Sequence, residues 1–296
     1  MPVLNLLRFI MAHPLNRDNK LKAIARFVKW QVGSRMLSGE IIYDWVNGSR
    51  FLVRAGETGL TGNIYTGLHE FQDMAFLLHV LRPTDLFIDV GSNVGSYTIL
   101  ACAAIGARGY AFEPVPGTYK RLIENIRINH LEDRVKCMNV GVGREQGNIY
   151  FTSDMDTSNH VLATGERNVT AIGVDVTSLD AVLGSETPAI MKIDVEGFET
   201  PVLEGALATL KKQTLHSVIV EIDVGENRYG FDQSRAMEIM FDHGFKTYSY
   251  NPLERTMVNL QGKKPEYGNT LFIRDVSLVL ERIKSSSRIT VLGKQF

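Results

Sequence analysis

The 296-residue sequence is poor in cysteine, in long apolar runs and in net charge, and each shortage excludes a class of protein. Its two cysteines, Cys102 and Cys137, form no CxxC motif and no histidine pairing, so we predict buried thiols and no metal site. No segment reaches the about 20 apolar residues of a transmembrane helix, so we expect no integral membrane segment. A formal net charge of -1 offers no general field for nucleic acid, which we do not expect as a partner.

Residues 1–50 are predicted to form a basic helical extension. The start, MPVLNLLRFIMAHPLN, has the apolar spacing of an amphipathic helix, and Asp18 is a candidate N-cap for the helical run after it. We expect the first helix to dock on the chain's own domain or on a twin subunit, which would form a homodimer through the N-terminal helices. In the alternative, a cytoplasmic protein is peripheral to a membrane through this helix. The apolar side chains available for such a surface are Leu4, Leu7, Phe9, Ile10 and Met11.

Residues 85–276 alternate regularly between strand and helix. Short, nearly all-apolar pieces such as LFIDV, AIMKID and SVIVEI are typical of strands covered on both faces, and their alternation with helices predicts a parallel sheet. The last two strands, FKTYSY and TLFIR, have no helix between them and should pair antiparallel. The sequence therefore predicts an α/β fold with a seven-stranded, mostly parallel sheet and an antiparallel last strand. Residues 51–84 are expected to form a small β and helical lead-in, and residues 277–296 a C-terminal tail.

A glycine-containing turn follows the first of these strands. The motif DVGSNVG begins at Asp89, and ligands of open α/β sheets bind at this end of the strands. Gly91 permits a tight turn close to a ligand, and Gly95 lets the next helix start near the strand. Free N–H groups of the turn, which also contains Ser92 and Asn93, are expected to receive a carboxylate, and Asp89 an ammonium.

An acidic residue ends the next strand. Glu113 lies 22 residues after Gly91 and is placed to accept two ribose hydroxyls, and Pro114 helps the chain leave the strand. Gly141, after the third strand, joins these cofactor-binding candidates. The turn GSNVGS does not match the dinucleotide fingerprint G-x-G-x-x-G. The spacing therefore favours S-adenosylmethionine (SAM), whose methionine part carries both a carboxylate and an ammonium, over NAD.

Charged side chains interrupt the fourth strand and its exit, KIDVEGFE. A charge in an apolar strand is costly unless it is paired or functional. Asp194 falls at the strand's carboxyl end and should face the crevice, and Lys192 lies on the same face. The structural interpretation is an ion pair of Lys192 with Asp194 or with Glu221. Glu196 is placed on the substrate side, or it begins the next helix, whose dipole favours acids.

Three blocks, DLFIDVGSNVGSYT, AFEPVPGTYKRLIENIRIN and IMKIDVEGFETPVLEGA, together resemble the FkbM family of SAM-dependent methyltransferases, over about residues 60–250. The resemblance implies a class I methyltransferase fold and methylation of hydroxyl oxygens, since known members act on sugars and polyketide macrocycles. The partner it implies is a small-molecule or glycan acceptor. Asp194 and Glu196 match the family's fourth-strand acidic block, while Ser92 departs from a frequent alanine. The residues implied to hold SAM are Asp89, Gly91, Asn93, Gly95 and Glu113.

Methyl transfer to a hydroxyl needs orientation and a proton acceptor. The two candidate bases are Asp194 and His160, which lies in the polar loop at 152–168. His69 and Glu70 are a weaker pair of candidates, which would line the entrance of the same crevice. Each of these residues also has a purely structural interpretation as a surface, loop or capping side chain.

Two rival functions stay open on the sequence alone. One is an NAD(P)-dependent oxidoreductase, which the glycine spacing disfavours. The other is a non-catalytic module that binds SAM or a nucleoside. Which of SAM and NAD raises the melting temperature would discriminate among them.

Overall fold

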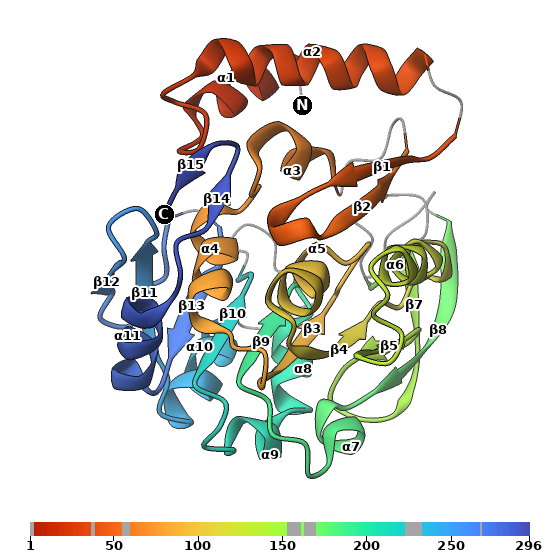
Figure 1. Cartoon of the computed structure of the whole chain (residues 1–296). Coiled ribbons are helices and arrows are strands. Elements are labelled where there is room, and N and C mark those ends of the chain that lie inside the picture. The colour runs from red at the N-terminus through yellow and green to blue at the C-terminus, as the bar shows by residue number, and fades with distance from the viewer. Residues whose placement is uncertain are drawn as a thin grey trace.

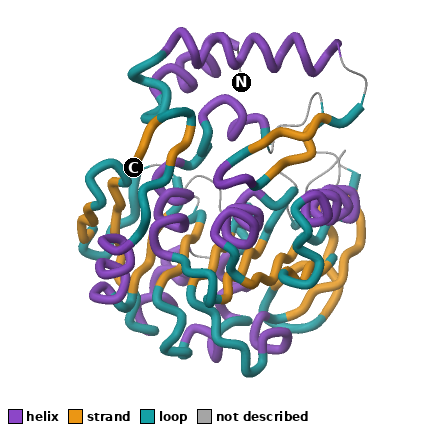
Figure 2. Tube along the Cα trace, in the orientation of Figure 1, coloured by secondary structure: helices purple, strands orange, loops and turns teal. Residues whose placement is uncertain are grey.

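The protein is described by a computed structural model that covers residues 3–36, 39–54, 60–152, 161–162, 170–222, 233–266 and 268–296. An α/β body forms most of it, with two N-terminal helices lying across one end (Figures 1 and 2). His160 and most of the predicted 152–168 loop lie outside the described residues.

The central sheet has eight strands within the described ranges. In chain order they are β3 (Leu86–Val90), β4 (Arg108–Phe112), β5 (Val135–Met138), β9 (Ile190–Ile193), β10 (Ser217–Val220), β11 (Lys246–Asn251), β12 (Thr256–Asn259) and β13 (Thr270–Ile273). Their spatial order is β12-β11-β13-β10-β9-β3-β4-β5. The strands from β10 to β5 are parallel, and β13 is antiparallel to both β10 and β11. The predicted α/β class with an antiparallel last strand is confirmed.

The sheet has one strand more than the sequence predicted. The additional strand, β12, pairs antiparallel with β11 at the sheet's edge. It follows a tight turn in which Arg255 has a φ of 54°, and its side chains are mostly exposed. An exposed edge strand does not need an apolar run, and the piece TMVN has none, so no pattern in the sequence predicts this strand.

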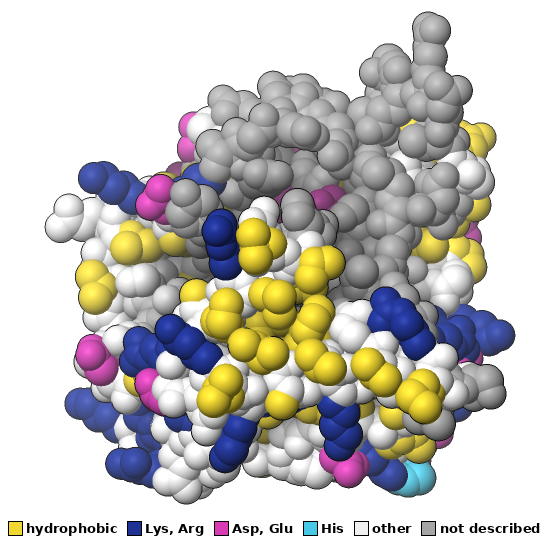
Figure 3. Space-filling model, turned by 90° about the horizontal axis from the view of Figure 1, so that it is seen from above, with side chains coloured by type: hydrophobic (Ala, Val, Ile, Leu, Met, Phe, Trp, Pro, Cys, Tyr) yellow, Lys and Arg dark blue, Asp and Glu magenta, His cyan; other side chains and the backbone are white. Residues whose placement is uncertain are grey.

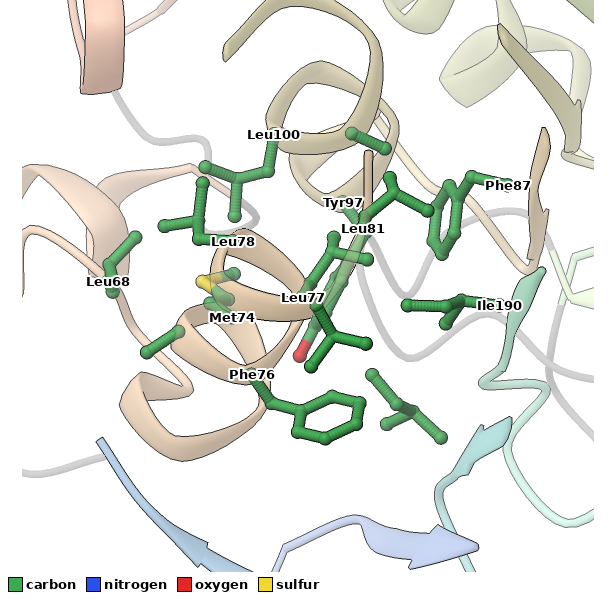
Figure 4. Packing of buried hydrophobic residues seen from close by; sticks show 14 of the residues in the cluster. Leu68, Met74, Phe76, Leu77, Leu78, Leu81, Phe87, Tyr97, Leu100 and Ile190 are labelled. Carbon is green, nitrogen blue, oxygen red and sulfur yellow. The ribbon is translucent and has the colours of Figure 1, made fainter. Parts of the chain in front are cut away.

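Helices cover both faces of the sheet, which explains why its parallel strands are apolar throughout. One face carries α4 (Phe71–Val80), α5 (Ser96–Ile99), the π-helix η2 (Leu100–Ile105), α6 (Pro116–Ile128) and α11 (Val276–Ser285). The other face carries α7 (Leu179–Leu183), α8 (Glu199–Glu204), α9 (Leu207–Leu210) and α10 (Gln233–Asp242). In Figure 4, Leu77 of α4 and Leu81, which follows this helix directly, pack between Leu100 of η2 and Ile190 of β9.

Two runs of the sequence are each divided between two elements of the structure. The run ETPVLEGALATLKK breaks at Gly205 into α8 and α9, and only glycine fits at this position, since a Cβ there would overlap the carbonyl oxygen of Gly143. The run RVKCMNVGV divides into β5 and the short β6 (Gly141–Val142), which belongs to another sheet. That sheet contains β6, β7 (Gly147–Thr152) and β8 (Ala171–Thr177).

The N-terminal region contains α1 (Val3–Ala12), α2 (Lys20–Met36), the hairpin of β1 (Ile41–Asp44) and β2 (Arg50–Val53), the 3-10 turn η1 (Val46–Gly48), and α3 (Thr61–Thr66). The helical part therefore ends at Met36 rather than at residue 50. The N-cap prediction for Asp18 is wrong: the Asn19 side chain accepts from the Lys22 amide, while Asp18 pairs with Lys294 at 2.6 Å. The proposed division of the chain at residues 50, 84 and 276 stays a prediction.

The C-terminal tail is ordered rather than loose. Asp275 caps α11 by accepting from the Leu278 amide at 3.0 Å. The hairpin of β14 (Thr290–Val291) and β15 (Lys294–Gln295) follows, and Phe296 is buried in the main core. Among the described residues, none of the helices combines the length and the apolar character that crossing a bilayer requires.

Candidate functional site

A cavity of about 1110 Å³ lies at the carboxyl ends of the parallel strands and extends beneath α1, α2 and α3. It brings together predicted residues from distant parts of the chain. Those that line it are Asp89, Gly91, Ser92, Asn93, Glu113, Pro114 and Gly141 on the predicted cofactor side, and His69, Glu70, Lys192, Asp194, Glu196 and Glu221 on the predicted acceptor side. Gly95 is not among them, and a side chain there would press on Leu122 of α6. Gly95 therefore serves helix packing.

Position 91 requires glycine because of its neighbouring atoms as well as its backbone angle. Its φ of 76° lies in the left-handed region, and a Cβ there would overlap the carbonyl oxygen of Asp194. The turn after β3 is thus pressed against the end of β9. This contact places the cofactor candidates of one strand next to the acidic residue of the other.

The amides of the glycine turn are already occupied, contrary to our expectation that they are free. Gly91 and Ser92 both donate to the Phe112 carbonyl, Val94 donates to the Asn93 side chain, and Gly95 donates to the Ser92 carbonyl. The Ser92 hydroxyl also donates to Phe112, at 3.2 Å. A ligand carboxylate must therefore find donors other than these amides.

Glu113 is a buried carboxylate held by two backbone amides. Its Oε2 accepts from the Asn93 amide at 3.0 Å and its Oε1 from the Val115 amide at 2.9 Å. Burial raises the pKa of Glu113 to about 7, although these hydrogen bonds oppose the shift. A carboxylate has about four acceptor sites, so further sites remain for the two hydroxyls of a ribose.

Asp89 is also buried and oriented. Its Oδ2 accepts from the Thr98 hydroxyl at 2.5 Å. Burial raises its pKa to about 6, while Lys192 opposes the shift. Asp89 thus offers an ionised acceptor at the cavity wall near neutral pH, as an ammonium group requires.

A buried lysine holds the acidic residues on the acceptor side. The Lys192 Nζ lies 2.5 Å from Asp194 Oδ2 and 4.7 Å from the centroid of the Tyr97 ring. Burial alone lowers the pKa of Lys192, but the carboxylates of Asp194, Glu70 and Asp89 outweigh it and raise this pKa above the ordinary value. The predicted ion pair of Lys192 with Asp194 is present, and Lys192 is a fixed cation at neutral pH.

Asp194 and Glu221 share one negative charge. Burial raises the pKa of Asp194, but the Lys192 ammonium outweighs burial and lowers it. The neighbouring Asp194 charge raises the pKa of Glu221 far above neutral, so Glu221 is protonated and donates a hydrogen bond to Asp194. Two neighbouring carboxyls whose pKa values are shifted in opposite directions are typical of groups that accept and hold a proton.

The same acids form a cluster that the sequence analysis did not predict as a metal site. One carboxylate oxygen from each of Asp194, Glu196 and Glu221 lies within 4.8 Å of the others. Oxygen ligands of this kind suit hard divalent cations. The Lys192 ammonium already contacts the cluster through Asp194 and supplies a positive charge there.

Tyr97 and Asn269 belong to the site but were missed by sequence reasoning. The Tyr97 hydroxyl donates to Glu70 Oε2 at 2.7 Å, and the Asn269 side chain donates to Glu70 at 3.3 Å and to Asp73 at 3.1 Å. Tyr97 follows the glycine turn directly, which was the one available signal. Asn269 comes from the start of β13, so only the folded sheet brings it to Glu70.

The acceptor end of the cavity is walled by the N-terminal region. Phe9 of α1 packs edge-on against His69, with ring centroids 5.2 Å apart. Trp30 and Gln31 of α2 also line the cavity, and the Gln31 side chain donates to the Tyr65 hydroxyl at 2.6 Å. Aromatic rings beside polar groups are suited to a ring-shaped, hydroxyl-rich ligand.

The buried acids predict that folding stability decreases as pH rises from 6.5 through about 7. Glu113 and Glu199 have pKa values of about 7 in the folded chain, raised mainly by burial, against 4.5 when exposed. Their stabilising effect is present below 4.5 and is lost as pH rises through about 7. Three histidines act in the opposite sense, because burial lowers their pKa values to about 4: His13, His79 and His216. Their contribution to folding stability increases between these pKa values and 6.5, the value of an exposed histidine, and changes little at higher pH.

The measurement is the free energy of unfolding by urea at pH 6.5 and at about pH 8. We expect a lower value at the higher pH. Glu199 lies outside the cavity lining, and its Oε1 accepts from the Gly197 amide, which glutamine can also satisfy. Glu199→Gln should therefore reduce the pH dependence, and an unchanged dependence in this variant would contradict the assignment.

The sheet order, the glycine turn and the carboxyl-end cavity define a class I methyltransferase. Residues 89–247 match the family described as the methyltransferase FkbM domain. The chain belongs to the FkbM family of methyltransferases, and membership implies the use of SAM. The oxidoreductase alternative is therefore not supported.

Three known proteins are similar to this chain. The hexuronic acid methyltransferase AglP of Haloferax volcanii is 33% identical over 154 residues, which span 50% of this chain and 60% of that protein. Methyltransferase FkbM from Methylobacillus flagellatus KT is 15% identical, with a TM-score of 0.45, over 72% of this chain and 52% of that one. TYW2 of P. horikoshii in complex with MeSAdo is 14% identical, with a TM-score of 0.39, over 86% and 83% of the two chains.

Proposed function

We propose that this chain transfers a methyl group from SAM to a hydroxyl of a sugar or glycan. The observation that carries the proposal is that one continuous cavity is lined by Glu113 and Asp89, by Lys192 and Asp194, and by the aromatic ring of Trp30. The hexuronic acid named for the similar archaeal protein makes a sugar acid the first acceptor to test. The compartment we propose is the cytoplasm, where the free thiols of Cys102 and Cys137 would persist.

The residues of the cofactor half fit SAM. Glu113 would accept the ribose hydroxyls, and Asp89 the methionine ammonium. Since the amides of the glycine turn are occupied, we assign the carboxylate to the side chains of Ser96 and Asn63, which line the cavity and lie 3.3 Å apart. When bound, SAM supplies a methyl group on a sulfonium, a carbon already activated for displacement.

The acceptor half would position a hydroxyl and take its proton. Asp194 carries the negative charge of its pair with Glu221, so one of its oxygens would accept a hydrogen bond from the acceptor hydroxyl. Lys192 holds that carboxylate in place at 2.5 Å. The alcohol oxygen loses its proton as the carbon–oxygen bond forms. A carboxylate with a low pKa is therefore sufficient as the base that receives this proton. His69 at the cavity wall is a second proton acceptor, and the role of His160 stays a prediction.

The direct test is mass spectrometry of glycans and glycolipids extracted from cells that produce either the active chain or its Asp194→Asn variant. We expect a sugar species heavier by one methyl group only with the active chain. The purified chain should then form that product, and S-adenosylhomocysteine, from SAM and a hexuronic acid or its glycan. Tight SAM binding without any methylated sugar in either experiment would contradict the proposal.

Removal of divalent cations is predicted to leave turnover unchanged. Lys192 already supplies the positive charge beside Asp194, so the carboxylates do not need a metal ion for charge balance. The measurement is the initial rate before and after treatment with EDTA. A loss of turnover that Mg²⁺ or Mn²⁺ restores would instead assign Asp194, Glu196 and Glu221 as metal ligands.

A further inference from the structure

Helix α2 carries apolar side chains on two opposite faces. One face, with Ala23 and Trp30, is buried against the domain together with Ile10 of α1. The opposite face of α2 is exposed to solvent although it is apolar. Its members, spaced so that a helix places them in one stripe, are Leu21, Val28, Val32 and Met36.

Exposed apolar side chains also lie on α1, the other helix at this end of the chain. Leu21 and Met36 are 81% and 78% exposed, and Val3 and Leu4 of α1 are 64% and 60% exposed. Figure 3 looks down on this end of the molecule and shows apolar side chains gathered together with lysines and arginines around them. A contiguous exposed apolar patch of this kind marks an interaction surface. We call the exposed stripe of α2 with Val3 and Leu4 the outer helical face.

Positive charge is concentrated on the same two helices. Between Val3 and Met36 the chain has seven lysines and arginines and one acid, Asp18, a net charge of +6. The whole chain has -1, so the rest carries -7. Asp18 is itself paired with Lys294. On the helix, Lys22 and Lys29 flank the stripe on one side, where their chains can lie along apolar surface and extend their charges.

We propose that the outer helical face binds the surface of an anionic lipid bilayer. Apolar side chains would enter the headgroup region while lysines and arginines meet lipid phosphates, which is the arrangement of an interfacial amphipathic helix. A symmetric dimer through this face would instead bring two copies of the same basic segment together, each with a net charge of +6 over residues 3–36, because both copies of a two-fold contact use the same patch. Charge thus favours the bilayer over a second copy of the chain.

Docking would also place the bilayer beside the acceptor end of the cavity. Gln31 and Arg35 line that cavity and belong to the same helix as the exposed stripe. The Arg35 guanidinium donates to the backbone and side-chain oxygens of Gln31, and the described part of the chain provides it with no carboxylate partner. If the proposed sugar methylation is correct, an acceptor carried on a lipid would reach the cavity from this side.

The test is flotation of the full chain with vesicles of phosphatidylcholine alone and of phosphatidylcholine mixed with phosphatidylglycerol. We expect flotation with the anionic vesicles, weakened by high salt, and little with the neutral ones. A variant with Leu21→Ser, Val28→Ser, Val32→Ser and Met36→Ser should bind them about tenfold more weakly, as should Lys22→Glu with Lys29→Glu. The matched control, Leu207→Ser with Val258→Ser, removes exposed apolar groups elsewhere and should float like the unchanged chain.

Flotation needs no turnover, so its result is independent of the proposed reaction. All variants should methylate a water-soluble acceptor equally and keep the unchanged melting temperature. Absence of binding by the unchanged chain, or equal binding by the stripe variant, would overturn the proposal. A chain that sediments as a dimer, while its stripe variant is a monomer that has lost no lipid binding, would assign the outer helical face to a second copy.

Discussion

Replacing Asp194 by asparagine is expected to lower kcat by about 10²–10⁴-fold, the usual contribution of a positioned proton acceptor. Asparagine keeps the size of the side chain but removes the charge that receives the hydroxyl proton. Binding of SAM should change little, because Glu113 and Asp89, rather than Asp194, are the residues proposed to hold SAM. Steady-state rates and calorimetric titration of SAM measure the two effects separately.

A second substitution makes this prediction sharper. Since the Asp194 charge is what mainly raises the pKa of Glu221, removing it should let Glu221 ionise and pair with Lys192. The double variant Asp194→Asn, Glu221→Gln should therefore be slower than Asp194→Asn alone. Full turnover in the double variant, with normal SAM binding, would exclude both carboxyls from proton transfer.

Replacing Gly91 by alanine is expected to destabilise the fold by about 2–5 kcal/mol, from left-handed backbone strain and overpacking combined. The new methyl group would overlap the Asp194 carbonyl oxygen at a φ of 76°. Relief requires the turn and the end of β9 to move apart, which should also abolish SAM binding. Urea unfolding and SAM titration of the same preparation test both consequences.

Gly106→Ala is the matched control for this substitution. Gly106 has a similar φ of 93°, but the nearest atoms to an added Cβ are 3.9 Å away. We expect only the backbone cost of about 1–2 kcal/mol and unchanged SAM affinity. Equal loss of stability in the two variants would show that contact with Asp194 contributes nothing.

The grouping of the cofactor candidates in one cavity could be predicted because these residues follow a local rule. Asp89, Gly91 and Glu113 each stand at or just after the carboxyl end of an apolar strand, and parallel strands bring these ends to one edge. Asp194 and Lys192 were found for the same reason, since a charge in a buried strand is conspicuous. The spacing of these residues along the chain was enough to place them in one cavity.

The rest depends on contacts between distant segments. The amides of the glycine turn were expected to be free, yet the Phe112 carbonyl of the neighbouring strand accepts from two of them. Glu70 could be suspected, but its partner Tyr97 comes from α5 and its partner Asn269 from the position just before β13. The aromatic wall of Trp30 likewise depends on how α2 docks. A single sequence does not show which distant segments come into contact, so these contacts are found only in the folded chain.

The central claim, that the glycine turn and Glu113 hold SAM, is tested most directly by calorimetric titration of SAM and of NAD into the unchanged chain and its Glu113→Ala variant. We predict that SAM binds one site per chain, that NAD gives no binding heat, and that the variant binds SAM about 10–100-fold more weakly through loss of charged hydrogen bonds. Circular dichroism at the same temperature should show both proteins folded. Binding of NAD in place of SAM, or unchanged SAM affinity in a folded Glu113→Ala variant, would contradict the account.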